Sequence, residues 1–178
     1  GDANKAKPAM VVSALISSSP TMLYFGQEVG ETAALDSGFG DPSRTTIFDY
    51  AGVPAHQNWL NDGKFDGGKL TAEQKQLREF YVKLMSLSAT EAVFNGAYQE
   101  LHSINKDTDG YSDKTYAFAR FNDSTKVIVA SNFATEATRF ELKLPADLQK
   151  QWQLSKGDYQ LQDLLSERKA SLTVTGDT

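Results

Sequence analysis

The sequence predicts a mixed α+β protein, in which a helix–strand–helix segment precedes a run of short antiparallel strands. Three observations support this fold class. An apolar run of helical length is followed near the N-terminus by a short apolar run of strand length. Residues 72–88 carry an apolar stripe at helical spacing, and after Ala97 the pattern becomes short alternating segments separated by turn residues. This order predicts two regions, residues 1–95 and 96–178.

The first helix is predicted from Pro8 onward. Proline suits the first turn of a helix, because its missing N–H has no partner to lose there. Residues 9–16 are then apolar almost all round, which is typical of a helix buried on most of its surface. Ser17-Ser18-Ser19-Pro20 ends the helix and leads directly into the next element.

The second element is a short apolar run, Met22-Leu23-Tyr24-Phe25, which Pro20 opens and Gly26 closes. Its length predicts a fully buried strand rather than a helix. Two polar residues, Gln27 and Glu28, follow at once. Carboxylates just past the C-terminal end of a buried parallel strand lie where α/β barrels build their active sites.

A long irregular segment, residues 29–70, comes next and is rich in glycine and aromatic residues. Loops of this length are functional or disordered, and the aromatic residues argue against disorder. Thr71 and Gln74 then fit a capping box. A helix is predicted over residues 72–88, with one apolar stripe made by Leu77, Phe80, Tyr81, Leu84 and Met85.

The C-terminal region has the pattern of an antiparallel β-sandwich, because short strands alternate with turn signals. Asn122-Asp123-Ser124 predicts a turn between the first two strands. Trp152 and Tyr159 do not predict a convergent aromatic surface, and we expect Trp152 to pack in the core. The strands are predicted at residues 115–121, 126–131, 138–144, 159–165 and 171–175.

Composition excludes several function classes. The 178 residues have a net charge of −5, which argues against nucleic-acid binding. Cysteine is absent and only two histidines occur, so disulfides and thiolate or histidine-rich metal sites are not expected. No stretch approaches the roughly 20 apolar residues of a membrane span.

The residues from Pro20 to Glu28, Pro-Thr-Met-Leu-Tyr-Phe-Gly-Gln-Glu, resemble the eighth barrel strand of the α-amylase family, glycoside hydrolase family 13. The family pattern is Gly-x-Pro, two apolar residues, Tyr-x-Gly, and Gln or Glu before Glu. This chain departs from it at Ser19-Pro20-Thr21. The resemblance implies that residues 1–95 hold the last helix–strand–helix of a (β/α)8 TIM barrel. It also implies that residues 96–178 form the C-terminal β-sandwich, which we expect to lack its last strand.

The resemblance further implies a retaining glycoside hydrolase that cleaves α-1,4-glucosidic bonds in starch or maltodextrins. Such hydrolysis uses two carboxyl groups. In the family, the catalytic carboxylates follow the fourth, fifth and seventh strands, so all of them would precede Gly1. We therefore expect no catalytic residue, no metal ligand and no cofactor in this chain, which would be inactive alone. The resemblance implies that Ca²⁺ can bind the full-length enzyme, with ligands upstream of this chain. Asp107-Thr108-Asp109-Gly110 faintly resembles part of a calcium loop but lacks its later glutamate, so no calcium site is expected there.

Five residues are candidates for sugar contact. Glu28 either touches the ligand or, as we favour, is a structural hydrogen-bond acceptor. Residues 43–50 loosely resemble a family loop, in which Arg44 either binds sugar hydroxyls or pairs with an acidic neighbour. Phe48 or Tyr50 would lie against a sugar ring. Trp59 either contacts sugar or, as we favour, anchors the long loop.

The expected partners are an α-glucan or maltooligosaccharide and the upstream part of the same enzyme. An unpaired strand exposes backbone groups and apolar faces, so residues 9–28 would be covered by that upstream part or by a second copy of the chain. The competing interpretation is a non-catalytic carbohydrate-binding or structural β-sandwich module. A periplasmic or secreted bacterial location is favoured over a cytoplasmic one.

Overall fold

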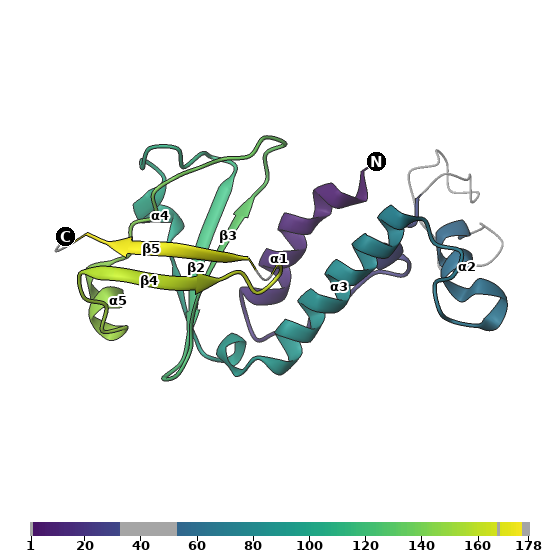
Figure 1. The fold of residues 1–178 in the computed structure, drawn as a ribbon, viewed down its shortest axis with the longest axis horizontal. Coiled ribbons are helices and arrows are strands. Elements are labelled where there is room, and N and C mark those ends of the chain that lie inside the picture. Colours follow the sequence, from purple (N-terminus) through teal and green to yellow (C-terminus); the bar gives the residue numbers. More distant parts are fainter. Residues whose placement is uncertain (1, 33–52, 167, 176–178) are drawn as a thin grey trace. The chain divides into compact units, whose positions relative to one another are not determined.

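The computed structural model describes residues 2–32, 53–166 and 168–175 (Figure 1). The chain gathers into two compact units. The first unit consists of Gly1–Lys7 and Pro20–Met85, and the second of Pro8–Ser19 and Ser86–Thr178. These units differ from the regions 1–95 and 96–178 expected above, because residues 8–19 group with the C-terminal half of the chain.

The first unit is mostly helical. It contains the short helices η1 (Ala3–Ala6), η2 (Gln27–Val29), α2 (Pro54–Leu60) and η4 (Asn61–Gly63), and most of α3 (Ala72–Thr90). The helix expected over residues 72–88 is confirmed. Its capping box is formed in both directions: Thr71 N–H donates to Gln74 Oε1 at 3.0 Å, and Gln74 N–H donates to Thr71 Oγ1 at 3.2 Å. Leu77, Tyr81 and Leu84 of the predicted stripe are buried.

The buried strand expected at residues 22–25 is wrong for this chain. No strand forms there, and Met22 is 82% exposed and Tyr24 46% exposed. A buried strand needs a neighbouring strand to pair with its backbone N–H and C=O groups. Among the described residues, the strands lie in the second unit and pair only antiparallel with one another.

The second unit combines helices with two antiparallel sheets. Helix α1 (Lys7–Leu15) begins next to Pro8, as predicted. The three-stranded sheet has the order β1-β2-β3, and β4 pairs with β5. The strands are β1 (Ala97–Glu100), β2 (Thr115–Phe121), β3 (Lys126–Asn132), β4 (Gly157–Gln162) and β5 (Lys169–Val174), with the short helices η5 (Ala92–Asn95), α4 (His102–Asn105) and α5 (Ala146–Gln151). The fold is therefore mixed α+β with antiparallel sheets.

The strands expected at 115–121 and 126–131 are confirmed, and so is the turn between them, where Asn122 Oδ1 accepts the N–H groups of Ser124 and Thr125. The strand expected at 138–144 does not form. Instead, the Asn105 side chain accepts from Lys143 N–H at 2.7 Å and donates to Lys143 C=O at 3.0 Å. A side-chain amide thus replaces a neighbouring strand, while Phe140, Leu142 and Leu144 still pack inward.

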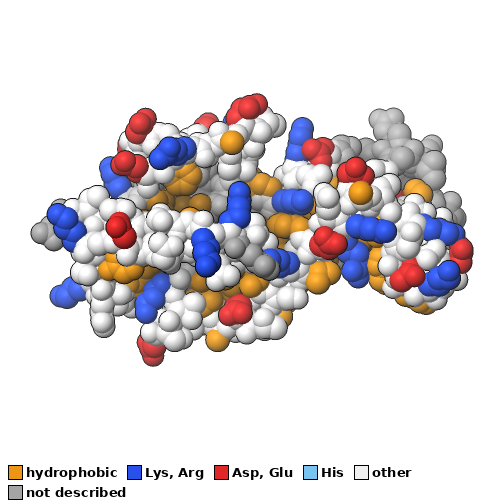
Figure 2. Space-filling view, in the orientation of Figure 1, with side chains coloured by type: hydrophobic (Ala, Val, Ile, Leu, Met, Phe, Trp, Pro, Cys, Tyr) orange, Lys and Arg blue, Asp and Glu red, His pale blue; other side chains and the backbone are white. Residues whose placement is uncertain are grey.

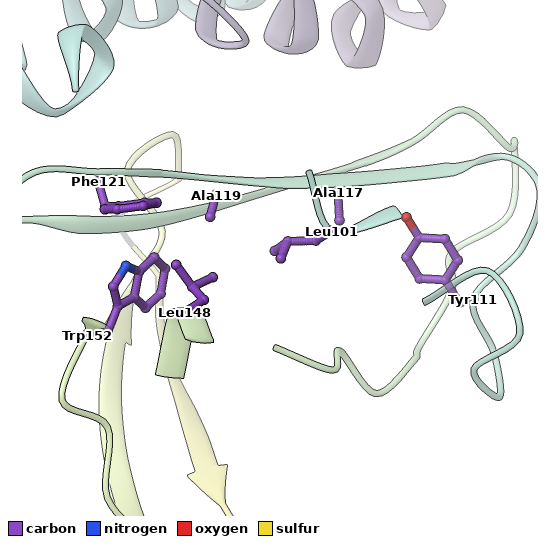
Figure 3. Close-up of a cluster of buried hydrophobic side chains, with 7 residues drawn as sticks. All are labelled: Leu101, Tyr111, Ala117, Ala119, Phe121, Leu148 and Trp152. Carbon is purple, nitrogen blue, oxygen red and sulfur yellow. The ribbon is translucent and has the colours of Figure 1, made fainter. Parts of the chain in front are cut away.

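One face of the three-stranded sheet carries the core of the second unit (Figure 3). Alternate residues of β2 meet α5 there, since Ala117, Ala119 and Phe121 share this face. Trp152 is 9% exposed and meets Phe121 edge-on at 5.6 Å, so its expected core packing is confirmed.

The opposite face of β2 carries a buried arginine. Arg120, 2% exposed, donates to three backbone carbonyls, those of Ile16 at 2.7 Å, Gly96 at 3.1 Å and Phe94. The guanidinium thereby connects the end of α1 and the η5 turn to the sheet, across about a hundred residues of sequence.

Surface charges on the face drawn in Figure 2 are interspersed, with acidic and basic side chains close to one another. Within the described ranges, no helix is long and apolar enough to cross a membrane.

Candidate functional site

A pocket of about 400 Å³ lies in the first unit, between residues 23–28 and helix α3. Helix α3 contributes Arg78, Tyr81, Val82 and Met85, whose spacing places them on one helix face. Residues 23–26 and Glu28 line the other side, and His56 reaches it from α2. The pocket therefore combines apolar walls with a carboxylate, a guanidinium, an imidazole and a phenol.

The turn after residue 25 depends on Gly26. Its φ of +77° is left-handed, and an added Cβ would lie 2.7 Å from Glu31 Cβ. The following residue, Gln27, fastens this turn to α3. Its Nε2 donates to Tyr81 OH at 3.0 Å, and its Oε1 accepts Tyr24 N–H at 3.1 Å. Gln27 thus holds the turn against α3 without lining the pocket itself.

Glu28 has a different environment from Gln27. Its side chain is half-buried and lines the pocket, yet its carboxylate has no hydrogen bond or ion pair within the described residues. Glu31 serves as a structural acceptor instead, since its Oε2 accepts His56 N–H at 3.0 Å at the start of α2. Within the part of the chain that the structure describes, the acceptor capacity of Glu28 is therefore available to a ligand.

A row of rings borders the pocket. Phe25 and His56 lie 4.2 Å apart, His56 and Trp59 5.8 Å, and Trp59 and Phe65 6.1 Å, all between ring centroids. The Arg78 guanidinium stands 5.1 Å from the centre of the Trp59 ring. Trp59 also packs on Val29, Ala55 and Leu70, which is the anchoring contact that we favoured for it.

Two polar atoms near the pocket are buried without a hydrogen-bond partner in the part of the chain that the structure describes, Arg78 Nε and His56 Nδ1. The guanidinium of Arg78 and the carboxylate of Glu28 form no ion pair with each other. A ligand that both donates and accepts hydrogen bonds can therefore accept from the Arg78 guanidinium and donate to the Glu28 carboxylate.

Tyr81 is the buried phenol of the pocket. Burial raises its pKa, the hydrogen bond from Gln27 lowers it, and the charge of Glu28 raises it. Tyr81 therefore stays neutral. Its oxygen accepts from Gln27, and among the described residues its O–H has no acceptor, so it can serve as a donor.

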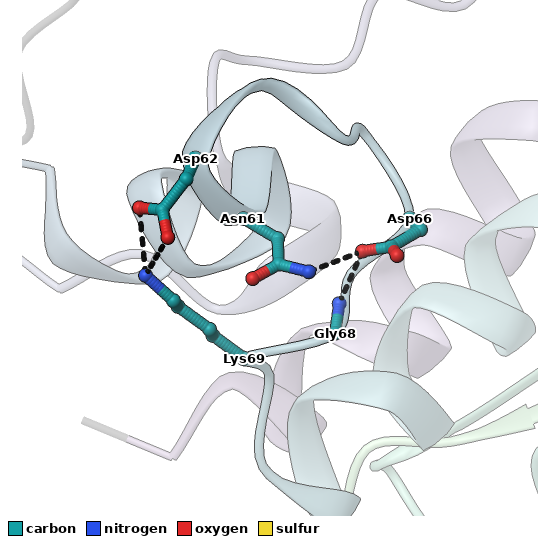
Figure 4. A network of polar contacts seen from close by, with 5 residues as sticks. All are labelled: Asn61, Asp62, Asp66, Gly68 and Lys69. Carbon is teal, nitrogen blue, oxygen red and sulfur yellow. Dashed lines mark hydrogen bonds and ion pairs between the residues drawn. The ribbon is translucent and has the colours of Figure 1, made fainter.

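The loop between α2 and α3 is fixed by polar contacts (Figure 4). Asp66 Oδ1 accepts from Asn61 Nδ2 and from Gly68 N–H, each at 2.8 Å, and these bonds lower the Asp66 pKa. Lys69 Nζ pairs with Asp62 at 2.7 Å. These carboxylates are occupied, and the described residues hold no group of three or more metal-ligating side chains.

Of the five candidates from the sequence, the structure places two. Glu28 lines the pocket, and Trp59 lies beside it under Arg78. Arg44, Phe48 and Tyr50 lie outside the described residues. Neither Arg78 nor His56 was among the five candidates. The signal for Arg78 was its position three residues before Tyr81, on the helix face that bears the apolar stripe.

Comparisons of the chain with family models, with curated proteins and with solved structures give no match.

Proposed function

We propose that this chain is the C-terminal part of an α-amylase-like glycoside hydrolase. Its full-length form would cleave α-1,4-glucosidic bonds in starch or maltodextrins with retention of configuration. The observation that carries the proposal is the Glu28 carboxylate, which has no partner among the described residues, ends the family-like Pro20–Glu28 segment and lines a pocket. Residues 1–95 would complete a TIM barrel, and residues 96–178 would form the supporting β-sandwich.

The pocket chemistry suits a sugar. Each sugar hydroxyl both donates and accepts, while the Glu28 carboxylate only accepts and the Arg78 guanidinium only donates. Apolar walls with a few polar groups are typical of small-ligand sites. The chain would thus supply one rim of an α-glucan site.

Catalysis would require groups from elsewhere in the protein. Retaining hydrolysis needs two carboxyl groups about 5 Å apart. In this proposal the upstream part of the enzyme provides these carboxyl groups, together with any Ca²⁺ ligands. The proposal also includes a periplasmic or secreted location for the enzyme. The isolated chain is expected to be inactive.

A non-catalytic carbohydrate-binding module is the alternative. The observation that favours it is that Glu28, His56 and Arg78 line the pocket within one unit of the chain, so binding needs no further part. In the third proposed role, the chain would support the rest of the protein and would not contact sugar.

Calorimetric titration with maltoheptaose tests these functions. Binding by the isolated chain that is lost in Glu28→Gln, but kept in the matched control Glu91→Gln, favours the module, since Glu91 is exposed and outside the pocket. Absence of binding, with hydrolysis of maltoheptaose once the upstream part is added, favours the enzyme. Neither binding nor hydrolysis in either preparation would refute both carbohydrate functions.

A further inference from the structure

Gln27 fixes the direction of the hydrogen bond that it makes with Tyr81. The backbone N–H of Tyr24 can only donate, and it donates to the Gln27 side chain at 3.1 Å, so the amide oxygen of Gln27 faces Tyr24. The amide nitrogen then faces Tyr81, whose phenol oxygen lies 3.0 Å away. Because an amide NH2 group can only donate, the Tyr81 oxygen accepts, and the Tyr81 hydrogen points away from Gln27.

The Tyr81 hydrogen therefore needs an acceptor from another direction. Tyr81 is only 2% exposed, and a buried O–H group without an acceptor is unfavourable. Burial also raises the pKa of Tyr81, so the phenol keeps this hydrogen at neutral pH. Among the described residues, no group accepts it. Since Tyr81 lines the pocket, a bound ligand can supply the acceptor.

We propose that Tyr81 donates a hydrogen bond to a hydroxyl group of the glucan in this pocket, and that Gln27 is the positioning residue that directs this donor. The inference rests on the proposed glucan function and names the group of the glucan that the pocket recognises.

Glu28 is the reason for assigning a hydroxyl. Its carboxylate lines the same pocket, and its charge raises the pKa of Tyr81, which places the carboxylate near the phenol. A hydroxyl can accept from Tyr81 and donate to Glu28 at the same time. A ligand carboxylate could only accept and would be repelled by Glu28, and an ammonium group could only donate.

The substitution Gln27→Glu separates this positioning role from a purely structural one. Glutamate has nearly the shape of glutamine, and one of its carboxylate oxygens can still accept Tyr24 N–H. Its other oxygen can only accept as well, so the Tyr81 hydrogen would turn toward it and away from the pocket. The variant keeps both contacts of the turn but withdraws the donor from the ligand. We expect it to fold like the wild type and to bind glucan more weakly.

Calorimetric titration with maltoheptaose tests the proposal. Gln27→Glu and Tyr81→Phe are each expected to weaken binding about tenfold, because each removes one hydrogen bond to the ligand. The variant that carries both substitutions should bind no more weakly than Tyr81→Phe alone, since phenylalanine has no hydroxyl to turn. Gln57→Glu is the control: it adds the same charge at an exposed position outside the pocket and should bind like the wild type.

If maltoheptaose is bound only when the upstream part is added, the same variants are compared by the kinetics of hydrolysis. Gln27→Glu and Tyr81→Phe should then raise KM about tenfold and leave kcat unchanged, as expected when a contact is made equally in the ground state and the transition state.

The outcomes separate this inference from the proposed function. Wild-type affinity in Gln27→Glu would overturn the positioning role and leave the glucan function standing. A loss in Gln27→Glu that persists in full in the Tyr81→Phe background would come from the added charge and would also overturn it. No binding or hydrolysis by the wild type would overturn both. Should Tyr81→Phe fail to fold, the comparison of Gln27→Glu with Gln57→Glu still decides.

Discussion

Arg120 shows how much a single side chain contributes to this fold. It lies on β2, is almost completely buried, and has no carboxylate partner among the described residues. Its guanidinium instead donates to carbonyls of Ile16, Phe94 and Gly96, which end a helix or a turn. Carbonyls at helix C-termini carry partial negative charge, so they stabilise a buried cation without a full counter-charge.

Replacement of Arg120 by Met is expected to lower the free energy of unfolding of the second unit by about 3 kcal/mol, because three buried carbonyls lose a charged donor. Trp152 fluorescence during urea unfolding, in a Trp59→Phe background, measures this unit alone. Arg139→Met is the control, since Arg139 is exposed. Equal stability of Arg120→Met and Arg139→Met would contradict the role given to Arg120.

Tyr81 predicts an alkaline dependence of stability. Burial is the largest influence on the pKa of Tyr81 and raises it above the ordinary value of 10.0. The hydrogen bond from Gln27 lowers this pKa, and the charge of Glu28 raises it. Because the folded-state pKa exceeds the unfolded one, this stabilisation is complete below pH 10 and is lost as pH rises through the raised pKa.

The check is the urea midpoint of the first unit, followed by Trp59 fluorescence in a Trp152→Phe background, at pH values from about 8 to 11. Tyr81→Phe should flatten the alkaline decline, whereas Tyr159→Phe, in the other unit, should not. An unchanged slope in Tyr81→Phe argues against the raised pKa.

Among the elements, α3 has an N-terminal cap formed by residues close to one another in the sequence. Thr71 and Gln74 exchange hydrogen bonds at its first turn, so Thr71→Ala is expected to cost about 1 kcal/mol. Far-UV circular dichroism during urea unfolding measures this. Gln76→Ala is the matched control on the exposed side of the same helix, with an expected change below about 0.5 kcal/mol. A Thr71→Ala variant as stable as Gln76→Ala would show that the cap contributes nothing.

At the scale of the whole molecule, α1 belongs with the distant sheet. Residues 8–19 share a compact unit with residues 86–178, and Ser88 Oγ donates to Ala14 C=O at 3.0 Å. Deletion of residues 1–19 is therefore expected to remove the Ile16 acceptor of Arg120 and to expose apolar surface of the second unit.

Such a protein should bind the dye ANS and lose its near-UV circular dichroism, as partly packed states do. Deletion of residues 1–6 alone removes no part of the second unit and is the control. A native near-UV spectrum after the longer deletion would show that the sheet half folds without α1.

The candidate site was predictable only in part. Glu28 was found because a polar residue directly after an apolar run is a local pattern, and Trp59 because aromatic residues are conspicuous in a long loop. Arg78 and His56 were not found, because only the folding of the chain brings them to the same pocket. Arg78 lies nineteen residues after Trp59 in the sequence, yet its guanidinium stands over the Trp59 ring.

The sequence by itself determined α1, α3, β2 and β3, since helical spacing, a capping box, strict alternation and an Asx turn act between near neighbours. Only the tertiary structure decided the state of residues 22–25 and 138–144. Both segments have strand-like patterns, but a strand also needs hydrogen-bond partners from elsewhere in the chain. Within residues 138–144 the Asn105 side chain bonds the backbone of Lys143, and no described strand pairs with residues 22–25.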